Sequence, residues 1–276
     1  MIFLYKKWND FCRELSLRGR KSIPAREVSR SNNKYIVLKH DVENNVSRAY
    51  KMAKIESNYG HRGSFYVQAH LMKDPKNVKL LSQMKEMGHE VSYHYDVMDS
   101  NKGNIRDAIT EFAHNKQVFE SYGFEINTVC QHGNPIIERV GYTSNRDFFR
   151  NDDVRKMYSN IVDIMVNFKE QANTDYTYYS DAGRKFKMIY DPINNDIVNS
   201  DDKNIVYNDL NALLFAIEKG ENCIVSTHPH RWASTAVPYL AKFYLFQMIK
   251  WVAKILVKIP AFKKVMSRYY YLAKKI

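Results

Sequence analysis

The chain of 276 residues is 45% hydrophobic and 26% charged, the composition of an ordinary globular protein, which excludes a disordered or collagen-like chain. Its length suits one large domain or two small ones. The formal charge of +12 indicates a nucleic-acid or membrane partner, unless the excess is confined to one segment.

The first 30 residues are expected to hold a short amphipathic helix that ends near Gly19. Beyond it, short apolar runs alternate with stretches of helical spacing. Strands are expected at 35–41, 63–68, 90–94, 126–132 and 223–228, and helices at 46–59, 77–87, 104–122 and 208–219. Each of these helices stops at a glycine, and the alternation predicts an α/β sheet or barrel of parallel strands with crossover helices. Residues 133–207 are expected to form long loops with short elements.

Polar side chains gather where the predicted strands end, which is where parallel α/β folds place their sites. These residues are His40, Asp41, Glu43, His94, Asp96, His132, His228, His230, Arg231 and Trp232. Five of the nine histidines are among them, so the pattern predicts a metal or acid–base site. His89 lies at the other end of strand 90–94 from His94, about 16 Å away at roughly 3.3 Å per residue, so the two cannot share a metal. His61, His70 and His114 are expected to be ordinary polar residues of the surface or loops.

Five segments resemble motifs of the polysaccharide deacetylase superfamily (NodB-homology, carbohydrate esterase type), in the branch whose first strand ends in an R-H-D-V-D pattern. In chain order they are LKHDVE, GHEVSYHYD, QHGNP, YYSDAGRKF and STHPHRW, and the resemblance covers most of residues 30–232. It implies a distorted (β/α) barrel, a divalent metal, usually zinc, and hydrolysis of an N-acetyl or related amide on a sugar.

The resemblance also implies roles for individual residues. Asp41 matches the catalytic base and His228 the acid, while Glu43 and His94 match metal ligands. Such residues suit the chemistry, because a metal acidifies water and polarises the amide carbonyl, a carboxylate takes the proton, and an imidazole protonates the leaving amine. The third ligand stays open among His132, His230 and Asp96, and we include His132 in the predicted metal site.

Substrate binding is expected from residues near the last strand and in the YYSDAGRKF segment. The candidates are His230, Arg231, Trp232, Asp181 and Arg184. Arg231 and Trp232 could contact sugar hydroxyls and stack on a sugar ring, or form a structural stack. Asp181 and Arg184 could bind substrate or form only an internal salt bridge.

Two departures from the family pattern favour a different function. Met98 stands where the family commonly has a second metal histidine, and a thioether is a poor zinc ligand. Glu43 replaces a shorter aspartate. The alternative is a catalytically silent barrel that binds glycan or assembles partners at a membrane, and a third possibility is hydrolysis of another C–N bond.

The positive charge belongs to the end of the chain. Residues 222–276 hold ten Lys/Arg and no Asp or Glu, whereas the first 221 hold 32 basic and 30 acidic residues. Lys250, Lys254 and Lys258 recur at helical spacing among apolar and aromatic residues. We expect a domain at 1–233 and a tail at 234–276, whose residues 236–276 lie on an anionic membrane surface. The alternative is a terminal helix packed on the barrel or on a second subunit, and no nucleic-acid partner is expected.

The cysteines and the amino terminus bear on the compartment. Cys12, Cys130 and Cys223 show no metal or disulfide pattern, and MIFLYKKWNDFCREL is a poor signal peptide. We therefore expect a cytoplasmic hydrolase, peripheral on the inner membrane face, that deacetylates a sugar such as a lipid-linked glycan during synthesis of cell-surface polysaccharide or glycolipid.

Overall fold

The computed structural model describes residues 2–28, 34–134, 137–172, 175–189, 192–193, 205–219, 222–241, 243–245 and 248. The chain divides into two compact units, one formed by Tyr5–Trp232 and the other by Ile2–Leu4 with the segment from Ala233.

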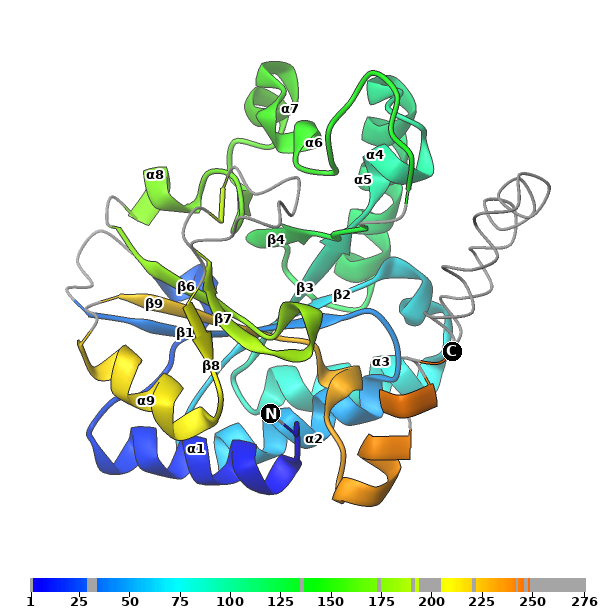
Figure 1. Ribbon diagram of the computed structural model, residues 1–276. Helices are drawn as coiled ribbons and strands as arrows, with labels where there is room; N and C mark the ends of the chain where they lie inside the picture. Colours follow the sequence, from blue (N-terminus) through cyan, green and yellow to red (C-terminus); the bar gives the residue numbers. More distant parts are fainter. Residues whose placement is uncertain are drawn as a thin grey trace. The chain divides into compact units, whose positions relative to one another are not determined.

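The first unit contains helices and strands in alternation (Figure 1). Its described strands are β1 (Ile36–Val42), β2 (Ser64–Val67), β3 (Glu90–Tyr95), β4 (Thr128–Gln131), β5 (Val162–Asp163), β6 (Thr177–Ser180), β7 (Phe186–Ile189), β8 (Ile205–Tyr207) and β9 (Cys223–Thr227). Its described α-helices are α1 (Tyr5–Leu17), α2 (Val46–Ser57), α3 (Pro75–Glu86), α4 (Val97–Ser100), α5 (Ile105–Ser121), α6 (Asp147–Arg150), α7 (Asp152–Met157), α8 (Phe168–Ala172) and α9 (Leu210–Lys219). Short 3-10 turns are η1 (Ala25–Glu27), η2 (Ala69–Lys73), η3 (Ala182–Arg184) and η4 (Pro229–Arg231).

The strands form one sheet in the order β5-β4-β3-β2-β1-β9-β6-β7-β8. All pairs from β5 to β6 are parallel, and β7 and β8 add an antiparallel margin. The predicted α/β class with parallel strands and crossover helices is therefore confirmed. The five predicted strands are β1, β2, β3, β4 and β9, and β5–β8 lie in the stretch expected to hold short elements. Closure into a barrel stays a prediction, because the pairings of the described strands form an open row.

Both faces of the central strands are buried. On the outer face, side chains of β1–β4 pack with α2, α3 and α5 around a cluster that includes Val42, Phe65, Val91, Val129 and Phe112. On the inner face, a second cluster includes Val37, Tyr66, Cys130, Tyr178 and Ile224. In Figure 1, α9, α1, α2 and α3 lie side by side on one face of the sheet, and neighbouring helices in this row are in contact. This burial explains why the strands are apolar runs in the sequence.

A polar network lies on the outer face of the sheet, between β1, β9 and the helices. His40 Nδ1 is bonded to Thr227 Oγ1 at 2.7 Å, and His40 Nε2 lies 2.8 Å from Glu56 Oε1. Trp8 Nε1 donates to the same Glu56 oxygen at 3.0 Å. Burial opposes ionisation of Glu56, but His40 outweighs it and holds the pKa of this carboxyl below its usual value. His40 thus follows the strand alternation to the outer face and is not part of the strand-end cluster.

The other histidines also have defined places. His61 lies in the loop before β2, as one of the two predicted contexts has it, but it is fully buried and not on the surface. It accepts a hydrogen bond from Ser22 N–H and bonds the carbonyl of Cys12. His70 and His114 are exposed. His89 precedes β3 and accepts a hydrogen bond from Gly63 N–H at 2.9 Å, at the end of the strand opposite to His94.

The three cysteines are free and buried, each in a different part of the first unit. Burial raises the pKa of the thiols of Cys12, Cys130 and Cys223 above the usual value. The sequence expectation of no disulfide framework agrees with these separate positions.

The second unit joins the start of the chain to the tail. Ala233 N–H donates to the carbonyl of Phe3 at 3.0 Å, Leu4 forms a parallel bridge with Ala233, and the Phe3 ring contacts the Tyr239 ring edge-on. Residues 236–241 and 243–245 are helical, whereas residues 249–276, including Lys250, Lys254 and Lys258, lie outside the described residues. Among the described helices, none has the length and apolar content that crossing a bilayer requires.

Gly63 is the closest backbone approach to the polar network. A Cβ atom there would lie 2.7 Å from the carbonyl oxygen of Leu38 and 2.8 Å from Glu56 Oε2. Because neither atom is the end of a flexible surface chain, we expect Gly63→Ala to lower the free energy of unfolding by about 1–3 kcal/mol, measured by urea denaturation. Gly133→Ala is the control, since a Cβ at Gly133 meets nothing within 4 Å. Equal stability of the two variants would contradict the steric account.

Candidate active site

The inner face of β1 carries a buried ion pair. Lys39 Nζ donates to both carboxylate oxygens of Asp41 at 2.6 Å, and also to Ser226 Oγ on β9 at 3.2 Å. The Lys39 side chain is 1% exposed and that of Asp41 10%. Burial opposes ionisation of Asp41, but the neighbouring ammonium outweighs it and lowers the pKa of this carboxyl to about 2. Asp41 is therefore an ionised base at neutral pH.

Three predicted metal ligands converge beside Asp41. Glu43 follows β1, His94 lies on β3, and His132 follows β4, and one ligand atom from each lies within 4.8 Å of the others. His132 Nε2 is 3.4 Å from Glu43 Oε1, and the His132 ring meets the His94 ring edge-on. These positions follow from parallel pairing, which brings the carboxyl ends of β1, β3 and β4 to one edge of the sheet.

The ring of His94 has a free nitrogen lone pair that could coordinate a cation. Its Nδ1 donates to the carbonyl of Cys130 at 3.0 Å, which fixes the tautomer with a lone pair on Nε2. That Nε2 is buried and has no hydrogen-bond partner. Burial lowers the pKa of His94 to about 4, so the ring is neutral at neutral pH. A buried lone pair facing a carboxylate and a second imidazole fits a zinc-like ion, for which a fixed outer nitrogen is typical.

A second donor set overlaps the first one. Asp41, His94 and Cys130 also offer ligand atoms within 4.8 Å of one another. Both oxygens of Asp41 already accept from Lys39, whose ammonium would repel a cation placed there. The set of Glu43, His94 and His132 therefore fits a divalent ion better.

His228 closes the other side of the cluster. It follows β9, and its Nε2 lies 3.8 Å from Asp41 Oδ2 and 3.8 Å from Glu43 Oε1. Its Nδ1 is bonded to Asp181 Oδ1 at 2.5 Å, and its backbone N–H donates to the other oxygen of Asp181. Arg231 donates to Asp181 as well. Burial opposes ionisation of Asp181, but His228 and Arg231 hold its pKa below the usual value.

These contacts favour the structural alternative for Asp181, while the role of Arg184 stays a prediction. Asp181 is fully buried and holds His228, so it does not face a substrate. Its carboxylate pairs with His228 and Arg231, and the backbone N–H of Arg184 donates to the carbonyl of Asp181. Arg184 also has a positive φ of 63° in the turn that follows β6.

Trp232 is buried. The side chain is 0% exposed, and its ring packs edge-on against Trp8 with centroids 5.2 Å apart. Stacking on a sugar needs an open ring face, so this burial favours the structural stack over the sugar stack. His230 and Arg231 keep partly exposed side chains beside Glu43 and Asp181, and remain candidates for substrate contact.

Neither of the other candidate third ligands belongs to the converging donor groups of the described residues. His230 Nδ1 is 3.9 Å from Glu43 Oε2, the oxygen that does not face His132. Asp96 begins α4, and its charge acts on Tyr93 and Glu111. Met98 is buried in the hydrophobic cluster of the outer face. The space beside Glu43 and His94 is taken by His132.

Two residues of the site were not identified from the sequence. Lys39 reads as one basic residue in an apolar run, and Cys130 as an isolated thiol. Strand alternation was the available signal, because Lys39 is two residues before Asp41 and Cys130 two before His132, on the same faces. A lysine inside a buried strand needs a counter-charge, which identifies its partner as the aspartate two positions on.

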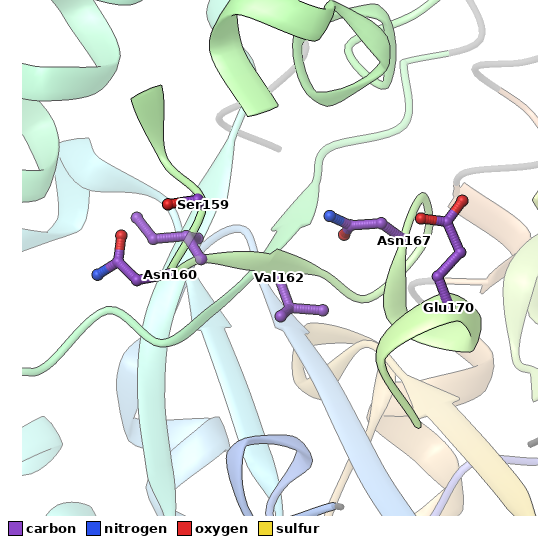
Figure 2. Close-up of a pocket in the computed structure, with 6 residues that line it drawn as sticks. Ser159, Asn160, Val162, Asn167 and Glu170 are labelled. Carbon is purple, nitrogen blue, oxygen red and sulfur yellow. The ribbon is translucent and has the colours of Figure 1, made fainter. Parts of the chain in front are cut away.

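A separate hollow lies at the edge strand β5. Its volume is about 360 Å³, and it is lined by Ser159, Asn160, Ile161, Val162, Asn167 and Glu170. Figure 2 shows Ser159 and Asn160 on one side of Val162, and Asn167 and Glu170 on the other. None of the predicted site residues lines this hollow.

Comparison with known proteins gives similarity in structure but not in sequence. No family model and no curated protein matches the chain. Among solved structures, the chain is similar to the catalytic domain of a peptidoglycan N-acetylglucosamine deacetylase from Eubacterium rectale, at 11% identity and a TM-score of 0.43, covering 80% of this chain and 86% of that one. It is also similar to the peptidoglycan deacetylase PdaC from Bacillus subtilis, at 14% identity and a TM-score of 0.38, covering 81% and 97%. Both of these proteins are peptidoglycan deacetylases.

The ion pair of Lys39 and Asp41 makes a testable contribution to stability. Lys39→Met leaves a buried carboxylate without its cation, and we expect the free energy of unfolding at pH 7 to fall by about 3–5 kcal/mol. The double variant Lys39→Met/Asp41→Asn should recover part of this loss, because it removes both charges. Urea denaturation of the four chains of this cycle measures the coupling.

Lys116→Met is the matched control for the lysine. Lys116 pairs with Glu120 on the surface of α5, and its loss is expected to cost less than about 0.5 kcal/mol. If Lys39→Met were as mild as Lys116→Met, the buried pair would not be important for folding.

Proposed function

We propose that the chain is a metal-dependent hydrolase that removes an N-acetyl or related N-acyl group from a sugar. The observation that carries this proposal is the convergence of two carboxylates and three imidazoles, from Asp41, Glu43, His94, His132 and His228, at one edge of the sheet. An amide hydrolase needs a Lewis acid, a base and an acid within reach of one carbonyl, and this cluster offers residues for each.

The fit of the donor set supports a divalent cation, for which zinc is the first candidate. Glu43, His94 and His132 would hold it, and it would polarise the amide carbonyl and make water more acidic. The unpartnered buried Nε2 of His94 is the strongest sign of an intended ligand. Imidazoles bind a metal in their neutral form, so this set adds one negative charge and leaves a divalent ion with net positive charge, which suits that role.

Two residues beside the cation site carry out the two proton transfers, one as the base and the other as the acid. Asp41, kept ionised by Lys39, accepts a proton from the attacking water. His228 donates a proton from Nε2 to the leaving nitrogen, while Asp181 holds its Nδ1 and so fixes the ring. The carbon–nitrogen bond breaks, the water oxygen joins the acyl carbon, and the products are a carboxylate and a free amine on the sugar.

The proposal is tested by hydrolysis of N-acetylglucosamine oligomers, followed through acetate release. We expect a chelator to abolish activity and zinc to restore it. Asp41→Asn and His94→Gln should each lower kcat/KM by at least about 100-fold, the usual scale for loss of an acid–base or metal-binding group. His114→Gln, a change of an exposed histidine, should leave activity intact.

Two results would contradict the proposal. Activity that survives both the chelator and Asp41→Asn would exclude this chemistry. A purified chain that retains no stoichiometric zinc, nickel or cobalt but still binds the oligomers would favour the silent glycan-binding barrel instead.

We further propose that the enzyme works at the cytoplasmic face of an anionic membrane, on a lipid-linked glycan. The tail supports this, because residues 234–276 hold nine Lys/Arg and no Asp or Glu. Its described part also exposes large apolar side chains, namely Val237, Tyr244, Leu245 and Met248. Apolar and aromatic residues beside cationic ones are typical of interfacial segments.

Sedimentation with vesicles tests the membrane proposal. We expect the full chain to bind vesicles that contain phosphatidylglycerol more strongly than phosphatidylcholine vesicles. Changing Lys250, Lys254 and Lys258 to Glu should weaken binding by at least about 100-fold, since each lysine near the surface contributes about 1 kcal/mol. The control variant changes the exposed Lys73, Lys76 and Lys79 of the first unit to Glu. It has the same net charge as the tail variant. Equal loss in both variants would show that only net charge matters and would exclude the tail as the contact.

A further inference from the structure

The third donor of the proposed metal site stands on a loop, not on a strand. β4 ends at Gln131, so His132 is already outside the sheet and is followed by Gly133. Met98, where the resembled family has its second histidine, faces the outer hydrophobic cluster. The chain must therefore fix His132 by means other than the strand ladder.

Both backbone groups of His132 are fixed. Its N–H donates to the carbonyl of Tyr95 at 2.7 Å, which ties it to the end of β3. Its carbonyl accepts from Asn145 Nδ2 at 2.8 Å. Asn145 is completely buried, 13 residues further along the chain and just before α6.

Asn145 is in turn held by Asp99 at two points. Asp99 N–H donates to Asn145 Oδ1 at 2.9 Å, and Asn145 Nδ2 donates to Asp99 Oδ2 at 2.8 Å. This reciprocal pair uses the second amide hydrogen of Asn145, while the first one reaches His132. The amide of Asn145 thus has no freedom to rotate away from the His132 carbonyl.

Asp99 also binds other residues of the loop that follows His132. Its carboxylate accepts two hydrogen bonds from Arg139, at 2.8 and 2.9 Å, and one from Tyr142 at 3.1 Å. Arg139 donates to the carbonyl of Asn134 as well, two residues after His132. The Asp99 side chain is 4% exposed, so this charge is buried at a cost that only complete pairing offsets.

We propose that Asp99 and Asn145 are positioning residues for His132, and that they set the affinity of the site for its cation. The inference rests on the proposed metal site. A ligand on a loop loses affinity when its backbone is free to move, because ordering it on binding costs entropy. Partners of metal ligands typically change affinity by 10–100-fold when they are removed.

Zinc titration of the full chain tests this inference. Asp99→Asn keeps the size of the side chain but removes the charge that holds Arg139 and Asn145. Asn145→Ala leaves the pair of Asp99 and Arg139 and removes the amide from His132. Both variants should bind zinc about 10–100-fold more weakly than the native chain.

Asp147→Asn is the matched control, because Asp147 is a carboxylate at the end of the same loop. It accepts hydrogen bonds from Thr143 and Arg150, and none from Asn145 or His132. We expect Asp147→Asn to bind zinc like the native chain even if urea denaturation shows a similar loss of stability. If Asp99→Asn does not fold, Asn145→Ala alone decides.

The outcomes separate the two proposals. A native chain that binds zinc, with Asp99→Asn and Asn145→Ala equal to Asp147→Asn, overturns the positioning role and leaves the proposed function intact. A native chain that binds no zinc overturns the proposed metal site, and this inference with it.

Discussion

The pairing of Lys39 with Asp41 is the interaction on which the site depends. Two charges lie two residues apart on one buried strand, so alternation directs both to the inner face, while His40 between them faces the helices. The ammonium keeps the carboxylate ionised in a place where burial alone would neutralise it. It also occupies both oxygens of Asp41, so Glu43 and the imidazoles are the groups left for the cation that we propose.

The fold was largely predictable because its signals are local. Apolar runs, helical spacing and closing glycines located β1, β2, β3, β4 and β9, and Gly88 and Gly123 do have positive φ angles after α3 and α5. The order of the strands and the margin formed by β5–β8 were not predictable from these signals. Strand order depends on which surfaces pack together, and short strands in polar segments resemble loops.

The strand-end rule identified the site more completely than the roles within it. It located Asp41, Glu43, His94, His132 and His228, which the structure brings together. It failed for His40 and Trp232, because the face and the exposure of a side chain depend on neighbours that are distant in sequence: Glu56 binds the first, and Trp8 packs against the second. The position of a residue along a strand predicts which end of the sheet its side chain occupies. Its exposure and its hydrogen-bond partners depend on tertiary packing.

The three buried cysteines have a practical consequence for spectroscopy. Cys12, Cys130 and Cys223 are free and buried, and the pKa of each thiol is raised. These thiols are therefore poor nucleophiles at neutral pH. A cysteine introduced at an exposed tail position, such as that of Tyr244, would be the readily modified thiol of the folded protein. A single fluorescent or spin label could then report on the tail without removal of any native cysteine.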